Sequence, residues 1–448
     1  MSKSSRKFSE LKEENLWKHS AFYMVFAGMQ KLISVGLAPI LTVILVPEEF
    51  AVLDTLILFN TLLVTIIVFG MDSATARFMY GKSGANQNLE ALLGGFIVVF
   101  IASFLVGIGG WLMSSFNSEF GGVLYTSNFK IRFWFSLSVP LTATFNLLVN
   151  YFKWVGYLRL MFGCSVAFSV LHIAIGVAVW KILQAPFMNS YFIGQASSAL
   201  ICVLVGMKGI IWNFTLSRVR NLLLPMIRFG LPFIFVGMGQ QGLFFLERLL
   251  ASNNLTTAEI GYYAANFRYS LLFKLPLLGV ITACGPICFA EFLGRGNDQV
   301  FLKMKLRLTR MFLCYSFIIT IFMTVPLFLD RSFGLINFTQ IGGLICVHLI
   351  DSFAGVFAAT YDIQKKTVNK AFAFIGSGLM ALICDWFLIA HVGINGLIVG
   401  NIISRLFLLI LCMSFYNKNF PKHTVSWANI GVAVAWAVVV LILILISI

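Results

Sequence analysis

Charged residues are scarce in this chain of 448 amino acids: Asp, Glu, Lys and Arg together make up 11%, against about 25% in soluble domains. Long polar segments are missing as well, since the longest cover about 81–90, 115–130 and 212–228. Hydrophobic residues reach 59% instead, and Phe alone contributes 46 residues. So much apolar surface cannot be hidden from water, which excludes a soluble protein and predicts a chain that lives in a bilayer.

Signals for catalysis, metals and cofactors are also lacking. All eight cysteines lie in apolar runs, and Cys284 and Cys288, one helical turn apart, have only Glu291 nearby, which is too few ligands for a metal site. We interpret them as small buried hydrophobic residues. The chain has no nucleophile motif, metal-ligand cluster or phosphate-binding loop. We therefore expect no enzyme, no metal and no cofactor.

Apolar stretches predict the fold class, an all-α polytopic membrane protein with about 12–13 transmembrane helices, because each span needs roughly 20 apolar residues. The stretches lie near 21–45, 52–72, 91–114, 133–152, 161–180, 189–207, 230–251, 260–290, 312–329, 333–361, 372–391, 396–416 and 426–448.

An internal repeat predicts two six-helix halves. The acidic turn around Glu49 and the acidic turn around Glu259 lie 210 residues apart, and each is followed by a bulky residue and a small one. Six spans fit between them, and halves in parallel orientation are typical of transporters with a substrate site between the halves. We predict a polar cytoplasmic N-terminus at 1–20, a six-helix half at 21–211, a cytoplasmic connector at 212–229, a second half at 230–416 and an extra helix at 426–448.

Basic residues predict the orientation. With a cytoplasmic N-terminus, the inner connections hold 23 of the 32 Lys and Arg residues and the outer connections hold four. The formal net charge of +15 therefore reflects topology and contact with anionic membrane lipids, and we expect no nucleic-acid partner.

Ionisable residues inside the predicted spans are the functional candidates, because burying them in a bilayer is costly. The bases are Lys31, Arg248, Arg268, Lys274 and Arg405, and the acids are Asp54, Asp72, Glu247, Asp351 and Asp385.

Lys31 and Lys274 lie near mid-depth, one in each predicted half. We expect them, with Arg268 and Arg248, to line a central cationic cavity that attracts an anion. The alternative interpretation pairs each base with an acid on a neighbouring helix. A cavity of this kind would bind a phosphate or another anionic group.

Span two carries a polar seam. Asp54, Thr61, Thr65 and Asp72 are spaced by 7, 4 and 7 residues, which aligns them on one helical face. We expect the seam to face the cavity, where Asp54 and Asp72 could couple transport to an ion. Hydrogen bonding between helices is the alternative.

The other charges, among them Arg77 at the inner end of span two, indicate structural or gating roles. Glu247 lies near the outer end of span seven, and Asp385 and Arg405 lie at similar depths on consecutive spans, which predicts an ion pair across that hairpin. His348 and Asp351 are spaced for a proton relay, but we favour packing for this pair.

Several segments resemble bacterial polysaccharide flippases of the Wzx type, within the larger multidrug/oligosaccharidyl-lipid/polysaccharide exporter superfamily. They are "VPEEFAVLDTLILFN" at the first outer turn, "FGMDSATARFMY" with Asp72 and Arg77, and "RFGLPFIFVG" at the start of span seven. The segments "LERLLASNNLTTAEIGYYAANFRYSLLFK", "DIQKKTVNKA" and "DWFLIAHVGINGLIVGNIIS" follow in the family's order. Ala51 in place of a Gly, Asp54 and a thirteenth span depart from the family pattern.

This resemblance implies a flippase in the bacterial inner membrane, with its N-terminus in the cytoplasm. The flippase would move an undecaprenyl-pyrophosphate-linked oligosaccharide to the periplasmic leaflet by alternating access. Polysaccharide polymerase and chain-length proteins are its implied candidate partners. Lys31, Lys274 and Arg268 would hold the pyrophosphate or acidic sugars, and Asp54, Asp72 or Asp351 would couple transport to an ion.

Three other classes stay open. A cation-coupled multidrug antiporter would need a cavity dominated by acids, whereas the predicted spans hold five bases and five acids. A membrane-integral polysaccharide polymerase or acyltransferase is disfavoured by the short outer connections. A purely structural membrane protein has no need of a Lys at mid-depth.

Overall fold

The computed structural model describes residues 41, 44–79, 87–116, 129–155, 157–208, 210, 216–274, 337–363 and 366–419. Within these ranges all regular structure is helical, which agrees with the predicted fold class. The predicted spans at 312–329 and 426–448, and most of the span at 21–45, lie outside the described residues.

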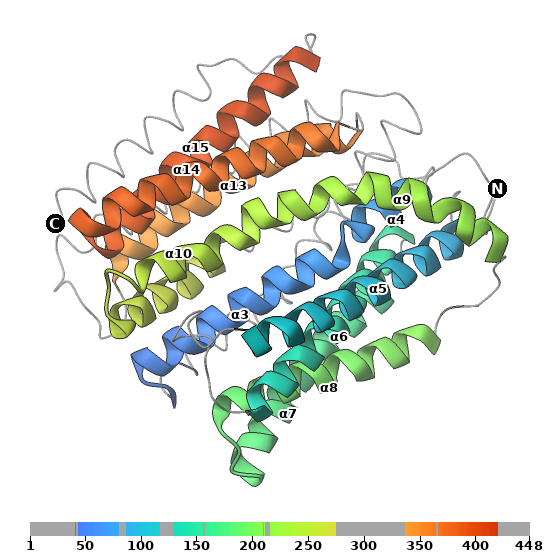
Figure 1. The fold of residues 1–448 in the computed structure, drawn as a ribbon, viewed down its shortest axis with the longest axis horizontal. Coiled ribbons are helices and arrows are strands. Elements are labelled where there is room, and N and C mark those ends of the chain that lie inside the picture. The colour runs from blue at the N-terminus through green and yellow to red at the C-terminus, as the bar shows by residue number, and fades with distance from the viewer. Residues whose placement is uncertain are drawn as a thin grey trace. The chain divides into compact units, whose positions relative to one another are not determined.

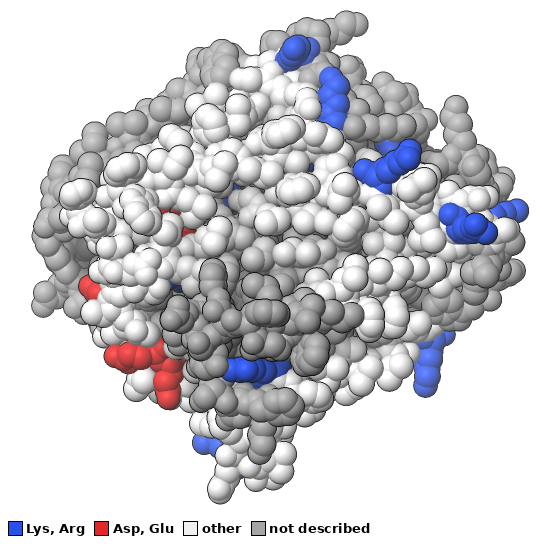
Figure 2. All heavy atoms as spheres, in the orientation of Figure 1, with Lys and Arg blue, Asp and Glu red and all other residues white. Residues whose placement is uncertain are grey.

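Eight of the described helical segments are long and apolar enough to cross a membrane. The first five are Pro47–Met79, Leu89–Val106, Arg159–Ile182, Phe187–Lys208 and Ser217–Ala251, and the last three are Phe338–Ala358, Thr367–Val392 and Ile394–Lys418. Figure 2 shows the matching surface, where most of the visible described atoms belong to uncharged residues. A surface with so little charge suits contact with lipid.

The described chain forms two compact units, one of Thr55–Gly242 and one that combines the described residues up to Asp54 with those from Leu243 onwards. The helix α3 (Pro47–Val68) therefore begins in the second unit and continues in the first. Pro47 is the first residue of α3 and already has a φ suited to a helix. Glu48 and Glu49 in the first turn stabilise the helix, because their negative charge lies at the positive end of the helix dipole.

The first unit contains α4 (Met71–Met79), α5 (Gln87–Phe116), α6 (Phe129–Val155), α7 (Leu158–Ile182), α8 (Phe187–Lys208), α9 (Leu216–Gly237) and the π-helix η1 (Met238–Gly242). In this unit α8 packs against α6 and α7, and α9 packs against α4 and α5 (Figure 1). The connector predicted at 212–229 is thus helical from Leu216, and the unit boundary falls at Gly242 instead.

The second unit contains α10 (Leu243–Ala251), a helix at residues 257–274, α13 (Phe338–Ile363), α14 (Thr367–Val392) and α15 (Ile394–Asn419). Helix α15 packs against both α13 and α14 (Figure 1). The apolar window of α13 is 83% buried and that of α15 is 72% buried, so these two helices form the interior of the unit. Gly393 joins α14 to α15 with φ 61°, a value that glycine adopts at no steric cost.

Candidate functional site

Eight ionisable side chains gather in the second unit, and we call them the charged cluster. They come from α3, α10, the 257–274 helix, α13, α14 and α15, and all but three are less than 3% exposed. The members are Asp54, Glu247, Arg248, Arg268, Lys274, Asp351, Asp385 and Arg405.

Asp54 binds two arginines at once. Its Oδ2 accepts a hydrogen bond from Arg248 Nε at 3.2 Å, and its Oδ1 accepts from Arg268 Nε at 3.0 Å and lies 2.8 Å from Arg268 Nη2. One carboxylate between two guanidinium groups leaves a surplus of one positive charge. Because the Asp54 side chain is only 2% exposed, this surplus lies in a poorly hydrated place where charge interactions are strong.

Aromatic rings surround the two arginines of this triad. The Arg248 guanidinium carbon lies 4.5 Å from the ring centre of Tyr263 and 5.6 Å from that of Phe267, and Arg268 lies 5.7 Å from the Phe50 ring centre. Ring faces attract cations and replace part of the hydration that burial removes. The rings therefore help to keep the arginines charged inside the bundle.

Asp351 on α13 is the centre of a second triad. Its Oδ2 accepts a hydrogen bond from Lys274 Nζ at 2.9 Å, and its Oδ1 lies 3.5 Å from Arg405 Nη1. Lys274 and Asp351 are each 16% exposed, whereas Arg405 is 1% exposed and lies 5.5 Å from the Phe244 ring centre. This triad, too, has one positive charge more than its carboxylate neutralises.

His348 packs inside the second unit. Its Nε2 lies 3.0 Å from Ser270 Oγ, and its ring meets the edge of Phe267 with 5.4 Å between ring centres. The charged partners of Asp351 are Lys274 and Arg405. This arrangement agrees with the packing interpretation of His348.

Glu247 on α10 and Asp385 on α14 are completely buried and interact electrostatically with one another. Among the described residues, neither carboxyl group has a hydrogen-bond partner of good geometry. Asn401 lies beside Glu247, but its amide donates to the Leu397 carbonyl oxygen of its own helix at 3.0 Å. Two neighbouring buried carboxyl groups of this kind can bind a proton or a cation between them.

The ion pair predicted between Asp385 and Arg405 is wrong. Arg405 pairs with Asp351, while Asp385 lies so close to Gly400 that a Cβ there would overlap its Oδ1. The charged group that acts on the Asp385 carboxyl group is Glu247.

The charge balance of the cluster depends on Glu247 and Asp385. Four bases face two carboxylates in the two triads. The cluster is neutral when Glu247 and Asp385 are both ionised, and it carries two positive charges when both are neutral. A change of protonation at these two residues would thus change how strongly the cluster attracts an anion.

The bases predicted to line a cationic cavity pair with carboxylates instead. Arg248, Arg268 and Lys274 all pair with acids on neighbouring helices, which was the alternative interpretation. Lys31 lies outside the described residues. That the surplus positive charge of the triads faces a cavity, and that these bases contact a substrate, both stay predictions.

The predicted polar seam is interrupted. Helix α3 ends at Val68, and Phe69 and Gly70 adopt φ values of 55° and 65°, so Asp72 belongs to the separate helix α4. The hydroxyl groups of Thr61 and Thr65 donate at 2.8 Å to carbonyl oxygens one turn earlier in their own helix. A seam that runs from Asp54 to Asp72 on one helix is thus wrong.

The first unit carries a neutral polar network that the sequence analysis missed. Asn60 donates to Ser138 Oγ at 2.8 Å, and Gln195 Nε2 lies 3.2 Å from both Asn60 Oδ1 and Thr142 Oγ1. These residues come from α3, α6 and α8, and the amides within apolar runs were the signal that could have revealed them. The network ties three helices together.

Three further charged residues of the first unit bear on the predictions. Glu90 on α5 is 2% exposed and lies 3.7 Å from Arg218 on α9. Arg77, a predicted gating or structural residue, lies on α4 and has a buried Nη1 without a hydrogen-bond partner among the described residues.

Solved structures with this fold are known, although no protein-family model and no curated protein matches the chain. An outward-facing multidrug resistance MATE family transporter of the MOP superfamily is similar with a TM-score of 0.74 at 15% identity, covering 94% of this chain and 99% of its own. A MATE structure in the straight conformation has a TM-score of 0.72 at 12% identity, covering 93% and 99%.

A third similar structure is a MOP superfamily transporter from Pyrococcus furiosus whose binding pocket is described as reversed in polarity, suggesting a different function. It has a TM-score of 0.65 at 16% identity and covers 89% of this chain and 96% of its own. The chain therefore has the fold of MATE transporters of the MOP superfamily.

Proposed function

We propose that this protein is a membrane transporter that moves an anionic, lipid-linked oligosaccharide from the cytoplasmic to the outer leaflet by alternating access. The observation that carries the proposal is the surplus of base in the two triads. Each places two cations on one carboxylate, inside a fold shared with transporters. An undecaprenyl-pyrophosphate carrier in a bacterial inner membrane fits both the charge and the sequence resemblance.

The cargo needs a protein because each bare hydroxyl group costs about 4–8 kcal/mol to move into hydrocarbon. An oligosaccharide with a pyrophosphate has many such groups, so its spontaneous crossing is negligible. Arg268 and Lys274 are the triad bases with partly exposed side chains, at 14% and 16%. They are the cations that an anionic headgroup would reach first.

Glu247 and Asp385 supply a route for coupling. Binding of a proton or cation at this buried pair would leave the positive charge of the triads uncompensated and raise their affinity for an anion. One charge that crosses a potential of 100 mV provides about 2.3 kcal/mol. Release of the ion on the other side would weaken anion binding and free the cargo.

A cation-coupled multidrug antiporter is the second candidate. Two of the similar structures are MATE transporters, and the buried carboxyl groups of Glu247 and Asp385 would suit a cationic substrate. The Pyrococcus furiosus protein supports keeping both candidates, because its pocket polarity is described as reversed within the same superfamily. The fold alone does not determine the charge of the cargo.

The test is transport by the purified protein in sealed vesicles. A fluorescent oligosaccharide on undecaprenyl pyrophosphate should cross to the far leaflet, and Arg268→Met and Lys274→Met should each slow this crossing with the protein still folded. Lys181→Met is the matched control, because Lys181 lies on Trp180 at the end of α7, 4.1 Å from the ring centre. Transport of a cationic dye with no movement of the lipid would favour the antiporter.

A further inference from the structure

Arg77 on α4 is a half-buried base without an acidic partner. Its Nη1 is buried and forms no hydrogen bond with any described residue. Within the same ranges no carboxylate lies at ion-pair distance from Arg77, whereas each base of the charged cluster has one. A guanidinium group stays protonated in proteins, so the charge of Arg77 persists. A buried donor on a persistent charge is costly unless an anion accepts from it.

The acids on α4 and on the helices around it do not supply that anion. Asp72 precedes Arg77 by five residues on α4, which turns the two side chains about 140° apart around the helix. Helix α4 packs against α5, α6 and α9, on which Glu90 is the one acidic residue. Glu90 lies 3.7 Å from Arg218 instead. The described chain therefore offers Arg77 no counter-ion.

A second arginine lies beside the first on the neighbouring helix. The rings of Phe78 on α4 and Phe229 on α9 meet edge to face, with 6.4 Å between their centres. Arg77 and Arg228 each directly precede one of these rings, so the two arginines flank one contact between packed helices (Figure 1). Arg228 is exposed and, like Arg77, has no ion pair with a described residue. The axes of packed helices are about 8–10 Å apart, a separation at which two arginine side chains can bind one anion.

Both arginines lie where the apolar runs of their segments end. Arg77 follows the apolar run 52–72 by five residues, and Arg228 precedes the apolar run 230–251 by two. Five residues of helix rise about 7.5 Å, which takes Arg77 out of the hydrocarbon core and into the layer of lipid headgroups. The anions of this layer are phosphate groups, and the fork of a guanidinium group matches their geometry.

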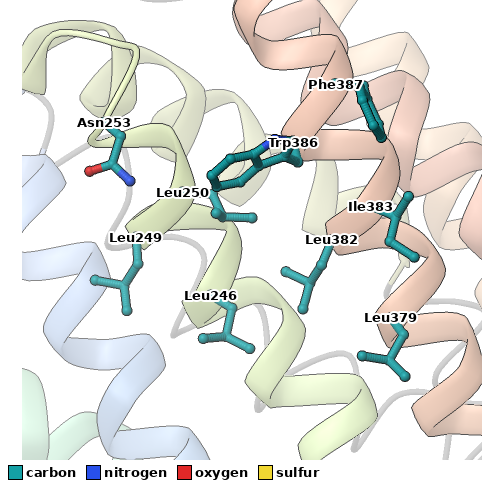
Figure 3. Close-up of a pocket in the computed structure, with 9 residues that line it drawn as sticks. All are labelled: Leu246, Leu249, Leu250, Asn253, Leu379, Leu382, Ile383, Trp386 and Phe387. Carbon is teal, nitrogen blue, oxygen red and sulfur yellow. The ribbon is translucent and has the colours of Figure 1, made fainter.

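The apolar groove between α10 and α14 (Figure 3) is no site for such a group. Eight of the nine residues that line it are apolar, and the ninth is Asn253, so no positive charge faces a ligand there. A phosphate against this lining would lose its hydration and gain no counter-ion. Recognition of a phosphate is better served by Arg77 and Arg228.

We propose that Arg77 and Arg228 bind the pyrophosphate of a lipid-linked substrate at the predicted cytoplasmic end of the first unit. A phosphodiester headgroup carries one negative charge, whereas a pyrophosphate diester carries two and matches two arginines that have no acids. The site serves the first capture of the headgroup and leaves translocation to Arg268 and Lys274. This assignment rests on the proposed function, because it takes the cargo to be an anionic lipid.

Titration with inorganic pyrophosphate tests the proposal. Calorimetry is performed on the full chain with Arg268→Met and Lys274→Met, which removes the triad bases that also attract anions. This chain should still bind pyrophosphate, and adding Arg77→Met or Arg228→Met should weaken binding at least about tenfold. In the otherwise wild-type chain the same changes should remove one binding site. Arg159→Met is the matched control, since Arg159 is an exposed base on α7, and it should leave the affinity unchanged.

Unchanged affinity in Arg77→Met and Arg228→Met would overturn this assignment alone, because transport of the lipid is measured separately. An equal loss in Arg159→Met would overturn it as well, by indicating general attraction to positive charge. Displacement of pyrophosphate by vesicles of phosphatidylglycerol would assign the site to ordinary phospholipids instead.

The unfolding midpoint separates binding from packing at Arg77. Because an unpaired, half-buried charge is costly, Arg77→Met should keep or raise the midpoint while it weakens pyrophosphate binding. A lower midpoint with pyrophosphate affinity intact would overturn the proposal and show that Arg77 has a structural role.

Discussion

At the scale of single residues, the buried charges of the second unit are organised around two carboxylates. Asp54 and Asp351 each pair with two bases on other helices. An ion pair inside a bundle contributes less than its Coulomb energy, because both ions lose hydration. Removal of one partner is far more damaging, since it leaves a charge buried and unpaired.

Asp54→Asn should therefore destabilise the protein by about 3–5 kcal/mol, because it strands Arg248 and Arg268 together without a carboxylate. The measurement is the thermal unfolding midpoint in detergent. Glu49→Gln, at an exposed position of the same helix, should leave the midpoint unchanged. Equal midpoints for both variants would mean that Asp54 does not hold the arginines in place.

Glu247→Gln and Asp385→Asn should behave in the opposite way. A neutral amide is less costly to bury than an unpaired carboxylate, so neither variant should lower the unfolding midpoint. Both should abolish the response of transport to an imposed proton or sodium gradient. A variant that unfolds early yet keeps this response would show that the carboxyl group is structural.

At the scale of elements, helices of the second unit approach one another where glycine leaves room. A Cβ on Gly261 would overlap the Pro47 carbonyl oxygen, which brings the start of the 257–274 helix against the start of α3. These are the two acidic turns that the internal repeat relates. The close approach positions Asp54 within reach of its two arginines.

Gly261→Ala should lower stability by about 1–3 kcal/mol, because the added methyl group forces the two turns apart. Gly355→Ala is the control, since nothing lies within 4 Å of a Cβ at that position of α13. There the change should stabilise the helix by about 0.5–1 kcal/mol. Unfolding midpoints of the two variants should thus move in opposite directions, and a shared direction would contradict this account.

The 257–274 helix begins with a capping box. Thr256 donates from its backbone N–H and from its hydroxyl group to Glu259 Oε2, both at 2.8 Å, and accepts from the Glu259 N–H at 3.3 Å. Thr256→Ala should cost about 0.5–2 kcal/mol of stability. The loss should appear in unfolding midpoints at neutral pH and be smaller for Thr256→Ser, which keeps the hydroxyl group.

The same cap should make stability depend on pH. The backbone N–H and hydroxyl of Thr256 hold the pKa of Glu259 below its ordinary value. Because the folded-state pKa is lowered, the contribution is complete above the unfolded pKa and is lost as the pH falls through the folded one. Glu259→Gln should flatten the acid limb of the midpoint–pH curve, and an unchanged curve would contradict the assignment.

At the scale of the whole molecule, apolar run length predicted the spans well. The spans expected at 372–391 and 396–416 lie within α14 and α15, because a helix in lipid must keep its charges out of the hydrocarbon core. The pairing of charges was not predictable in this way. Asp54 and Arg248 lie 194 residues apart, and only tertiary packing brings them together.

Local backbone geometry accounts for the error in the polar seam. The seam assumed one straight helix, and the positive φ values of Phe69 and Gly70 follow the end of α3 at Val68, four residues before Asp72. Gly70 was the available signal, since glycine is the residue that adopts such a conformation freely. Hydropathy carries no information of this kind, because Phe69 and Gly70 both suit an apolar run.

The proposed transport requires that the protein recognise negative charge on its cargo. The direct measurement compares translocation rates for one oligosaccharide lipid with its pyrophosphate and for the same lipid with the phosphates replaced by a neutral linker. The wild-type protein should move the anionic form much faster, and Lys274→Met combined with Arg268→Met should erase that preference. Equal rates for the two lipids, or faster movement of the neutral one, would contradict the account.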